Sequence, residues 1–275
     1  MKRIISEQNP IYKDLVRLKQ RKAREKEGVF LAEGFHLVEE AERCGLTIRQ
    51  VFADDDLLES GREGGETLRA FLDDMEQKGC LVTLLAGGLF AKVAETETPQ
   101  GVLALVEKQS WDPAEVLGTP GDGKNLLVLD RIQDPGNLGT LIRTADCAGY
   151  AGAVLLKGTA DPYNAKALRA AAGSLFRVPC IQIGTAEEAI ELLHKAGKTV
   201  LATSPRDSKV CYDVPMKENI ALVIGNEGQG ACDAFLDGAD QRIMIPMEGG
   251  AESLNAAVAA AILLYETVRQ RHHNF

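Results

Sequence analysis

The chain of 275 residues has a formal net charge of −9, and 45% of its residues are hydrophobic. This composition is typical of a soluble globular protein and excludes a disordered or fibrous one. No apolar run approaches the roughly 20 residues that span a bilayer, and the first ten residues lack the apolar core of a signal peptide, so we expect a cytoplasmic protein without membrane contacts.

The length exceeds what one average domain needs, which predicts two domains of about 100–150 residues each. The six cysteines are scattered without a CxxC pair, and the four histidines do not complete a metal-ligand pattern. Their spacing predicts neither a disulfide framework nor a zinc site. We therefore expect no metal.

The first 27 residues differ from the rest of the chain in charge, because they hold nine Lys and Arg residues against four acids. The basic residues are Lys2, Arg3, Lys13, Arg17, Lys19, Arg21, Lys22, Arg24 and Lys26. A local basic stretch can bind a phosphate backbone even on an acidic protein. A solvated helix face explains the same pattern equally well.

The first part of the chain alternates between helical and strand patterns. Ile11, Leu15 and Leu18 recur at helical spacing, which predicts an amphipathic helix over 10–25. Two more helices are predicted at 35–44 and 66–79, and strands at 28–33, 48–53, 81–86 and 101–107. This alternation predicts an α/β domain.

Residues 108–124 hold two prolines and three glycines without a sustained period, which predicts a linker between domains at 1–107 and 125–275. In the second domain we expect strands at 126–130, 153–156, 178–183, 198–203 and 220–225, and helices at 138–148, 164–176, 185–196 and 253–271. The strand-like run 242–247 precedes the final helix. This order predicts a parallel sheet with helices on both faces.

The final helix is expected to bury one apolar face. The residues of that face are Leu254, Val258, Ala261, Tyr265 and Val268.

Three segments of the second domain share one design, an apolar strand that runs into a loop with Gly or Pro. They are 126–149, 221–230 and 243–266. Ligands of open α/β sheets bind at the carboxyl ends of strands, so these loops are expected to form one pocket. The glycines of GNEGQG (225–230) do not match G-x-G-x-x-G, which disfavours an ordinary dinucleotide site.

In this order, the three segments resemble the motifs of the SpoU/TrmH branch of the SPOUT methyltransferase superfamily. The resemblance is carried by Asn137-x-Gly139-x-x-x-Arg143-Thr144-Ala145, by Gly225-Asn226-Glu227-Gly228, and by Ile245-Pro246-Met247 followed by Ser253-Leu254-Asn255. It covers roughly residues 125–270. The first hundred residues are similar, more weakly, to the substrate-binding domain that precedes the catalytic domain in many members.

The resemblance implies a deep trefoil knot in a mostly parallel α/β fold, preceded by a small α/β RNA-binding domain that resembles a ribosomal protein. It also implies that S-adenosylmethionine is the cofactor and that the chain forms a homodimer through its carboxy-terminal domain. The cofactor contacts that it implies are Thr203, Gly225, Asn226, Gly228, Ile245, Pro246, Met247 and Leu254.

The activity implied by the resemblance is methyl transfer to a ribose 2′-hydroxyl of RNA, with 23S ribosomal RNA as the expected substrate. The implied catalytic residues are Arg143, Asn137, Glu227, Ser253 and Asn255. Arg143 has two open roles, as a clamp on phosphate or as an aid to proton loss, and the clamp is favoured because a guanidinium is normally a permanent cation.

Ordinary structural roles compete at single positions. Asn137 could stabilise a turn, Ser253 could cap the final helix, and Glu227 could be a surface acid. Three other functions also stay open: methylation of transfer RNA, methylation of a base nitrogen, and RNA or ribosome binding without catalysis.

Overall fold

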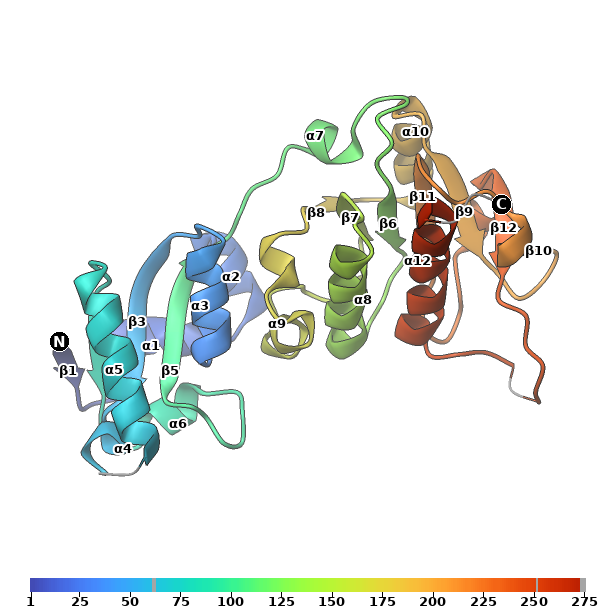
Figure 1. The fold of residues 1–275 in the computed structure, drawn as a ribbon. Helices are drawn as coiled ribbons and strands as arrows, with labels where there is room; N and C mark the ends of the chain where they lie inside the picture. The colour runs from blue at the N-terminus through green and yellow to red at the C-terminus, as the bar shows by residue number, and fades with distance from the viewer. Residues whose placement is uncertain (61–62, 251, 273–275) are drawn as a thin grey trace. The chain divides into compact units, whose positions relative to one another are not determined.

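The structure is a computed structural model that describes residues 1–60, 63–250 and 252–272 (Figure 1). The chain divides into two compact units, one of Met1–Gln109 with Tyr163–Arg169 and the other of Ser110–Pro162 with the chain from Ala170 onward. The domain limits expected from the sequence stay a prediction.

The first unit is built on a mixed sheet with the strand order β1-β4-β3-β5-β2. Its strands are β1 (Lys2–Ile4), β2 (Val29–Glu33), β3 (Ile48–Asp54), β4 (Val82–Leu85) and β5 (Val102–Glu107). Its helices are α1 (Pro10–Arg17), α2 (Arg21–Glu27), α3 (Phe35–Arg43), α4 (Asp55–Glu59), α5 (Glu63–Gln77) and α6 (Leu89–Val93). The predicted alternation is confirmed, while β1, α4 and α6 are too short for the sequence pattern to predict.

The single helix predicted over 10–25 is wrong, because the chain divides it into α1 and α2. The side chain of Arg24 is only 6% exposed and donates to the carbonyl oxygens of Leu18 at 2.9 Å and Lys19 at 2.6 Å. Carbonyl groups at a helix end lack intrahelical partners, and the buried guanidinium satisfies them here.

The basic stretch is partly neutralised within the first unit. Five of its side chains contact acids or carbonyl oxygens, namely Arg3, Arg17, Lys19, Arg21 and Arg24. Lys13, Lys22 and Lys26 are exposed and form no ion pair within the described part of the chain. The positive charge available to a ligand is therefore smaller than the residue count indicates.

The second unit contains a parallel sheet with the strand order β10-β12-β9-β11-β6-β7-β8. The strands are β6 (Leu126–Leu129), β7 (Gly152–Leu156), β8 (Cys180–Ile183), β9 (Thr199–Thr203), β10 (Lys209–Val210), β11 (Ile220–Ile224) and β12 (Gln241–Met244). All six strand pairs are parallel, which confirms the predicted parallel sheet. The central strands β6 and β11 are buried along their whole length, as expected for strands covered on both faces.

The helices from Pro113 onward are α7 (Pro113–Leu117), α8 (Pro135–Cys147), α9 (Ala165–Ala171), α10 (Ala186–Lys195), α11 (Asp233–Gly238) and α12 (Ala256–His272). Alternate residues of β6, Leu126 and Val128, join a core with Leu193 of α10 and Phe235 of α11. In Figure 1, α8 and α12 lie side by side in front of the sheet, and these two helices pack against each other. No described helix is long and apolar enough to cross a membrane.

The segment expected as an irregular linker contains the short helix α7, whose Val116 and Leu117 are buried in the core of the second unit. Lys198, whose side chain is fully buried, pairs with Asp122 at 2.5 Å and donates to the carbonyl oxygen of Lys124 at 3.1 Å. These contacts attach residues 113–124 to the parallel sheet.

The apolar face predicted for the final helix is wrong. Val258 and Tyr265 are 49% and 51% exposed, whereas Ala260, Leu263 and Leu264 are buried. Apolar residues surround most of this helix, so their spacing does not select the face that packs. The helix also begins at Ala256 rather than at residue 253.

Candidate functional site

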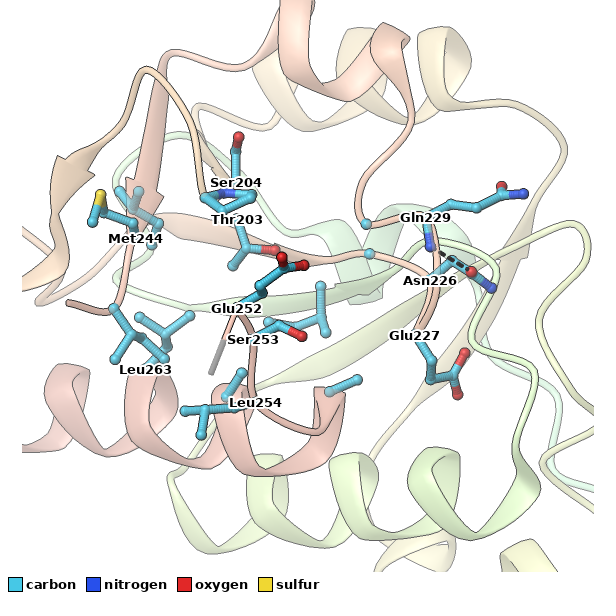
Figure 2. A pocket seen from close by; sticks show the side chains of 18 of the residues that line it. Thr203, Ser204, Asn226, Glu227, Gln229, Met244, Glu252, Ser253, Leu254 and Leu263 are labelled. Carbon is cyan, nitrogen blue, oxygen red and sulfur yellow. Dashed lines mark hydrogen bonds between the residues drawn. The ribbon is translucent and has the colours of Figure 1, made fainter. Parts of the chain in front are cut away.

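A cavity of about 520 Å³ lies at the carboxyl ends of β9, β11 and β12. It is lined by the loops that follow these strands and by the first turns of α12 (Figure 2). This volume is within the range of small-molecule sites, and the carboxyl edge of a parallel sheet is where such sites form.

The structure places most of the predicted site residues around this cavity. Nine of them line it: Thr203, Gly225, Asn226, Glu227, Gly228, Ile245, Met247, Ser253 and Leu254. Pro246, Asn137, Asn255 and Arg143 are not among the described residues that line it. Asn137 and Asn255 nevertheless join its wall through Glu227, whereas Arg143 lies on the exposed side of α8.

The loop after β11 is a tight hairpin. Backbone hydrogen bonds join Asn226 to Gly230 in both directions, at 3.0 and 2.8 Å, and the Asn226 side chain accepts the N–H groups of Gly228 and Gln229 at 3.0 Å each. A Cβ at Gly225 would overlap the backbone of Gly230 and reach within 2.6 Å of Ala231 Cα. Glycine is therefore required at position 225 because the returning backbone occupies the space of a side chain.

Glu227 and two asparagines form a polar network beside the cavity. The Glu227 carboxylate accepts the Nδ2 group of Asn137 and the backbone N–H groups of Gln133 and Asp134, each at 3.1 Å. The Oδ1 atom of Asn137 accepts the Nδ2 group of Asn255 at 3.1 Å. Three motifs that are distant in the sequence thus meet at Asn137.

The network keeps Glu227 ionised. Partial desolvation raises the pKa of its carboxyl group, but the hydrogen bonds from Gln133, Asn137 and Asp134 outweigh that effect, so the pKa lies below its ordinary value. A carboxylate with a lowered pKa is a poor proton acceptor. Glu227 is thus suited to orient Asn137.

The capping residue of the final helix is Asn255. Its Oδ1 atom accepts the N–H groups of Ala257 at 2.9 Å and Val258 at 3.3 Å. The alternative in which Ser253 caps this helix is therefore wrong, and Ser253 faces the cavity instead (Figure 2).

Several lining residues were not predicted from the sequence. They are Ser204, Pro205, Ile224, Gln229, Gly230, Ile243, Met244, Glu252, Ala256, Ala259 and Leu263. These residues lie at the end of a strand, in the loop that follows it or in the first turns of α12, so their position at the carboxyl edge of the sheet was an available signal.

A parallel sheet with a ligand-sized cavity among the loops that follow three of its strands is typical of an α/β protein that binds a small molecule. The chain matches the SpoU rRNA Methylase family over residues 124–265 and the MRM3-like substrate binding domain over residues 9–104. The chain belongs to the SpoU rRNA methylase family, which confirms the resemblance and, with it, the SPOUT fold class.

Two relatives illustrate the similarity. The chain is 38% identical to the 23S rRNA (guanosine(2553)-2'-O)-methyltransferase RlmP of Bacillus subtilis over 96% of this chain and 98% of the relative. It is 32% identical to the 23S rRNA (uridine(2479)-2'-O)-methyltransferase of Streptomyces viridochromogenes, over 92% of this chain and 87% of the relative.

Solved structures of relatives share the whole fold. The AdoMet-bound rRNA methyltransferase from Sinorhizobium meliloti is 31% identical, with a TM-score of 0.84 over 100% of this chain and 99% of that one. The SpoU methyltransferase AviRb from Streptomyces viridochromogenes, in complex with AdoMet, is 28% identical, with a TM-score of 0.84 over 98% of this chain and 100% of that one.

Proposed function

We propose that this chain methylates a ribose 2′-hydroxyl of 23S ribosomal RNA with S-adenosylmethionine as the methyl donor. The observation that carries the proposal is the network of Glu227, Asn137 and Asn255 beside a ligand-sized cavity. Membership of the family and the names of the relatives support the reaction, and they favour ribosomal over transfer RNA.

The cavity suits a cationic cofactor with an apolar part. Its lining includes Leu254, Leu263 and Met244, and its only charged members among the described residues are Glu227 and Glu252. A negatively charged lining favours a sulfonium or ammonium group. When bound there, S-adenosylmethionine supplies a methyl group that its own positive charge activates.

The chain's own residues have to bind the RNA and hold its hydroxyl group. Asn137, fixed by Glu227 and Asn255, is proposed to orient the ribose. Arg143 is exposed on α8 and is proposed to bind an RNA phosphate through its planar guanidinium, whose N–H groups match the phosphate oxygens. Ser253 completes the polar side of the cavity.

The test is incubation of the protein with radiolabelled S-adenosylmethionine and 23S rRNA that lacks the modification, followed by nuclease digestion and mass spectrometry. We expect one 2′-O-methylated nucleotide, and R143K is expected to lower turnover because lysine lacks the bidentate geometry. A methylated base with an unmodified ribose would contradict the proposal, as would absence of cofactor binding at millimolar concentration.

We further propose that residues 1–107 form the RNA-binding domain and act through α2. Lys22 and Lys26 lie one helical turn apart and are exposed, whereas Arg21 pairs with Glu25 at 2.6 Å. The double variant K22E/K26E should weaken RNA binding and reduce its salt dependence, since each phosphate contact releases counterions. R21Q is the matched control, and an equal loss in R21Q would contradict this role.

We propose a cytoplasmic homodimer in which the exposed apolar face of α12 forms the interface. This face presents Val258 and Tyr265, which lie two helical turns apart. Exposed apolar side chains grouped in this way are typical of interfaces. In analytical ultracentrifugation, V258E/Y265E should sediment as a monomer, while L81E, which changes an exposed leucine of the first unit, should stay dimeric.

A further inference from the structure

Arg131 has an unusual backbone conformation directly after β6. Its φ angle is +58°, in the left-handed region that side chains other than glycine seldom adopt. A residue keeps such a conformation only where its surroundings fix it. Arg131 does not line the cofactor cavity among the described residues, so the cause of its conformation lies elsewhere.

The side chain of Arg131 pairs with the residue that precedes it in the chain, Asp130. Its Nε atom donates to Asp130 Oδ1 at 2.8 Å and its Nη2 atom to Asp130 Oδ2 at 3.1 Å. Successive side chains along a strand point to opposite faces, so a continuing strand would keep the two groups apart. The left-handed residue ends that alternation and brings the guanidinium onto the carboxylate, which is 2% exposed.

The same pair holds the loop that follows β11, residues 225–232, at three places. The Arg131 carbonyl oxygen accepts the Nδ2 group of Asn226 at 2.9 Å, and Arg131 Nη1 donates to Gln229 Oε1 at 3.1 Å. Asp130 Oδ2 accepts the N–H group of Cys232 at 2.7 Å. In Figure 2 the side chain of Gln229 points away from Thr203, so its backbone borders the cavity while its amide serves another contact.

We infer that Asp130 and Arg131 are positioning residues that hold loop 225–232 in its binding conformation and thereby set the affinity for S-adenosylmethionine. The inference rests on the proposed function, because it assumes that the cofactor occupies the cavity. The guanidinium is engaged by Asp130 and Gln229, so Arg131 acts on the loop and not on RNA phosphate.

The test uses the full-length variants R131Q and R131G. In calorimetry, both should bind S-adenosylmethionine about tenfold to a hundredfold more weakly, since hydrogen bonds to charged groups are lost. The kcat at saturating cofactor should stay within about twofold, because the pair does not touch the reacting groups. Hydrogen exchange should rise in a peptide that covers 225–232 and stay unchanged in β9.

R131G separates the effect of losing the guanidinium from the effect of backbone strain. Glycine adopts the left-handed conformation freely, and it keeps the carbonyl group that Asn226 contacts. The matched control is R177Q. Arg177 also makes two contacts with a single carboxylate, since its Nε and Nη2 atoms donate to Asp146 at 3.0 and 2.8 Å.

The outcomes are distinguishable. Wild-type affinity in R131G would overturn the inference, as would an equal loss of affinity in R177Q or a fall in kcat with unchanged cofactor affinity. If the wild-type protein itself does not bind S-adenosylmethionine, the proposed function is wrong, and the inference that rests on it is wrong as well.

Discussion

Replacement of Gly225 by alanine should abolish tight cofactor binding. The added methyl group would overlap backbone atoms of Gly230 and Ala231, and no flexible side chain is available to move aside. Carbon atoms normally stay about 3.5–4 Å apart, whereas the new Cβ would lie 2.6 Å from Ala231 Cα and closer still to Ala231 N and Gly230 C, so the hairpin has to shift by well over about 1 Å.

The magnitude follows from the hydrogen bonds that such a shift breaks. Two join Asn226 to Gly230, at 3.0 and 2.8 Å, and a third joins the Cys232 N–H to a carboxylate at 2.7 Å. At about 1 kcal/mol each, their loss amounts to about 3 kcal/mol. Since about 1.4 kcal/mol corresponds to a factor of ten, we expect the Kd for S-adenosylmethionine to rise roughly a hundredfold.

Calorimetry with S-adenosylmethionine measures the effect, and Gly249→Ala, in the loop that follows β12, is the control. Gly249 is not among the described residues that line the cavity, and a Cβ there meets no atom within 4 Å, so G249A should bind nearly as wild type does. The reasoning is refuted if G225A retains wild-type affinity, or if G249A loses as much affinity as G225A.

Three further changes should have measurable effects. N137A removes the link between Glu227 and Asn255 and should lower kcat roughly tenfold to a hundredfold, with little change in the KM for S-adenosylmethionine. A rise in that KM as large as the fall in kcat would contradict a role of Asn137 beside the cavity. The folded-state pKa of Glu227 is lowered, so its contribution to stability is complete above the ordinary value of about 4.3 and is lost as pH falls through the folded pKa. The Tm difference between wild type and E227Q should therefore be constant from pH 7 to about 5 and shrink below, and a constant difference down to pH 3 would refute the pKa shift. K198M removes the buried partner of Asp122 and should destabilise the protein by about 3 kcal/mol, seen as a fall in Tm of roughly 10 °C, which K198M/D122N should partly reverse.

The parallel sheet and the position of its ligand site could be predicted from the sequence for a physical reason. Strands buried on both faces read as short continuous apolar runs, and the loops at their carboxyl ends contain Gly and Pro. The order of the motifs around Asn137 and Gly225 then indicated the family. The roles of the individual residues stay predictions, since the structure shows where they lie and not what they do.

Other features depend on contacts that no local pattern encodes. Arg24 breaks the first predicted helix by turning back onto carbonyl groups, although its type and spacing suggested an outward charge. The face of α12 that packs is decided by α8 rather than by its own periodicity, so Val258 and Tyr265 are exposed. The pairing of Asp130 with Arg131 requires a left-handed residue that the sequence does not mark with glycine.

The strand order of the parallel sheet has a consequence for synthesis of the chain. β6 can pair with β7 as soon as residue 156 is made, but its other edge pairs with β11, and the adjacent contact between Asn125 and Ile220 spans 95 residues. At synthesis rates of about 5–20 residues per second, that edge stays open for roughly 5–20 s. The first unit's sheet, by contrast, has all of its strands once residue 107 has emerged. Among the strand edges that become paired, the edge of β6 that lies at the centre of the finished parallel sheet is thus exposed to mispairing for longest while the protein is made.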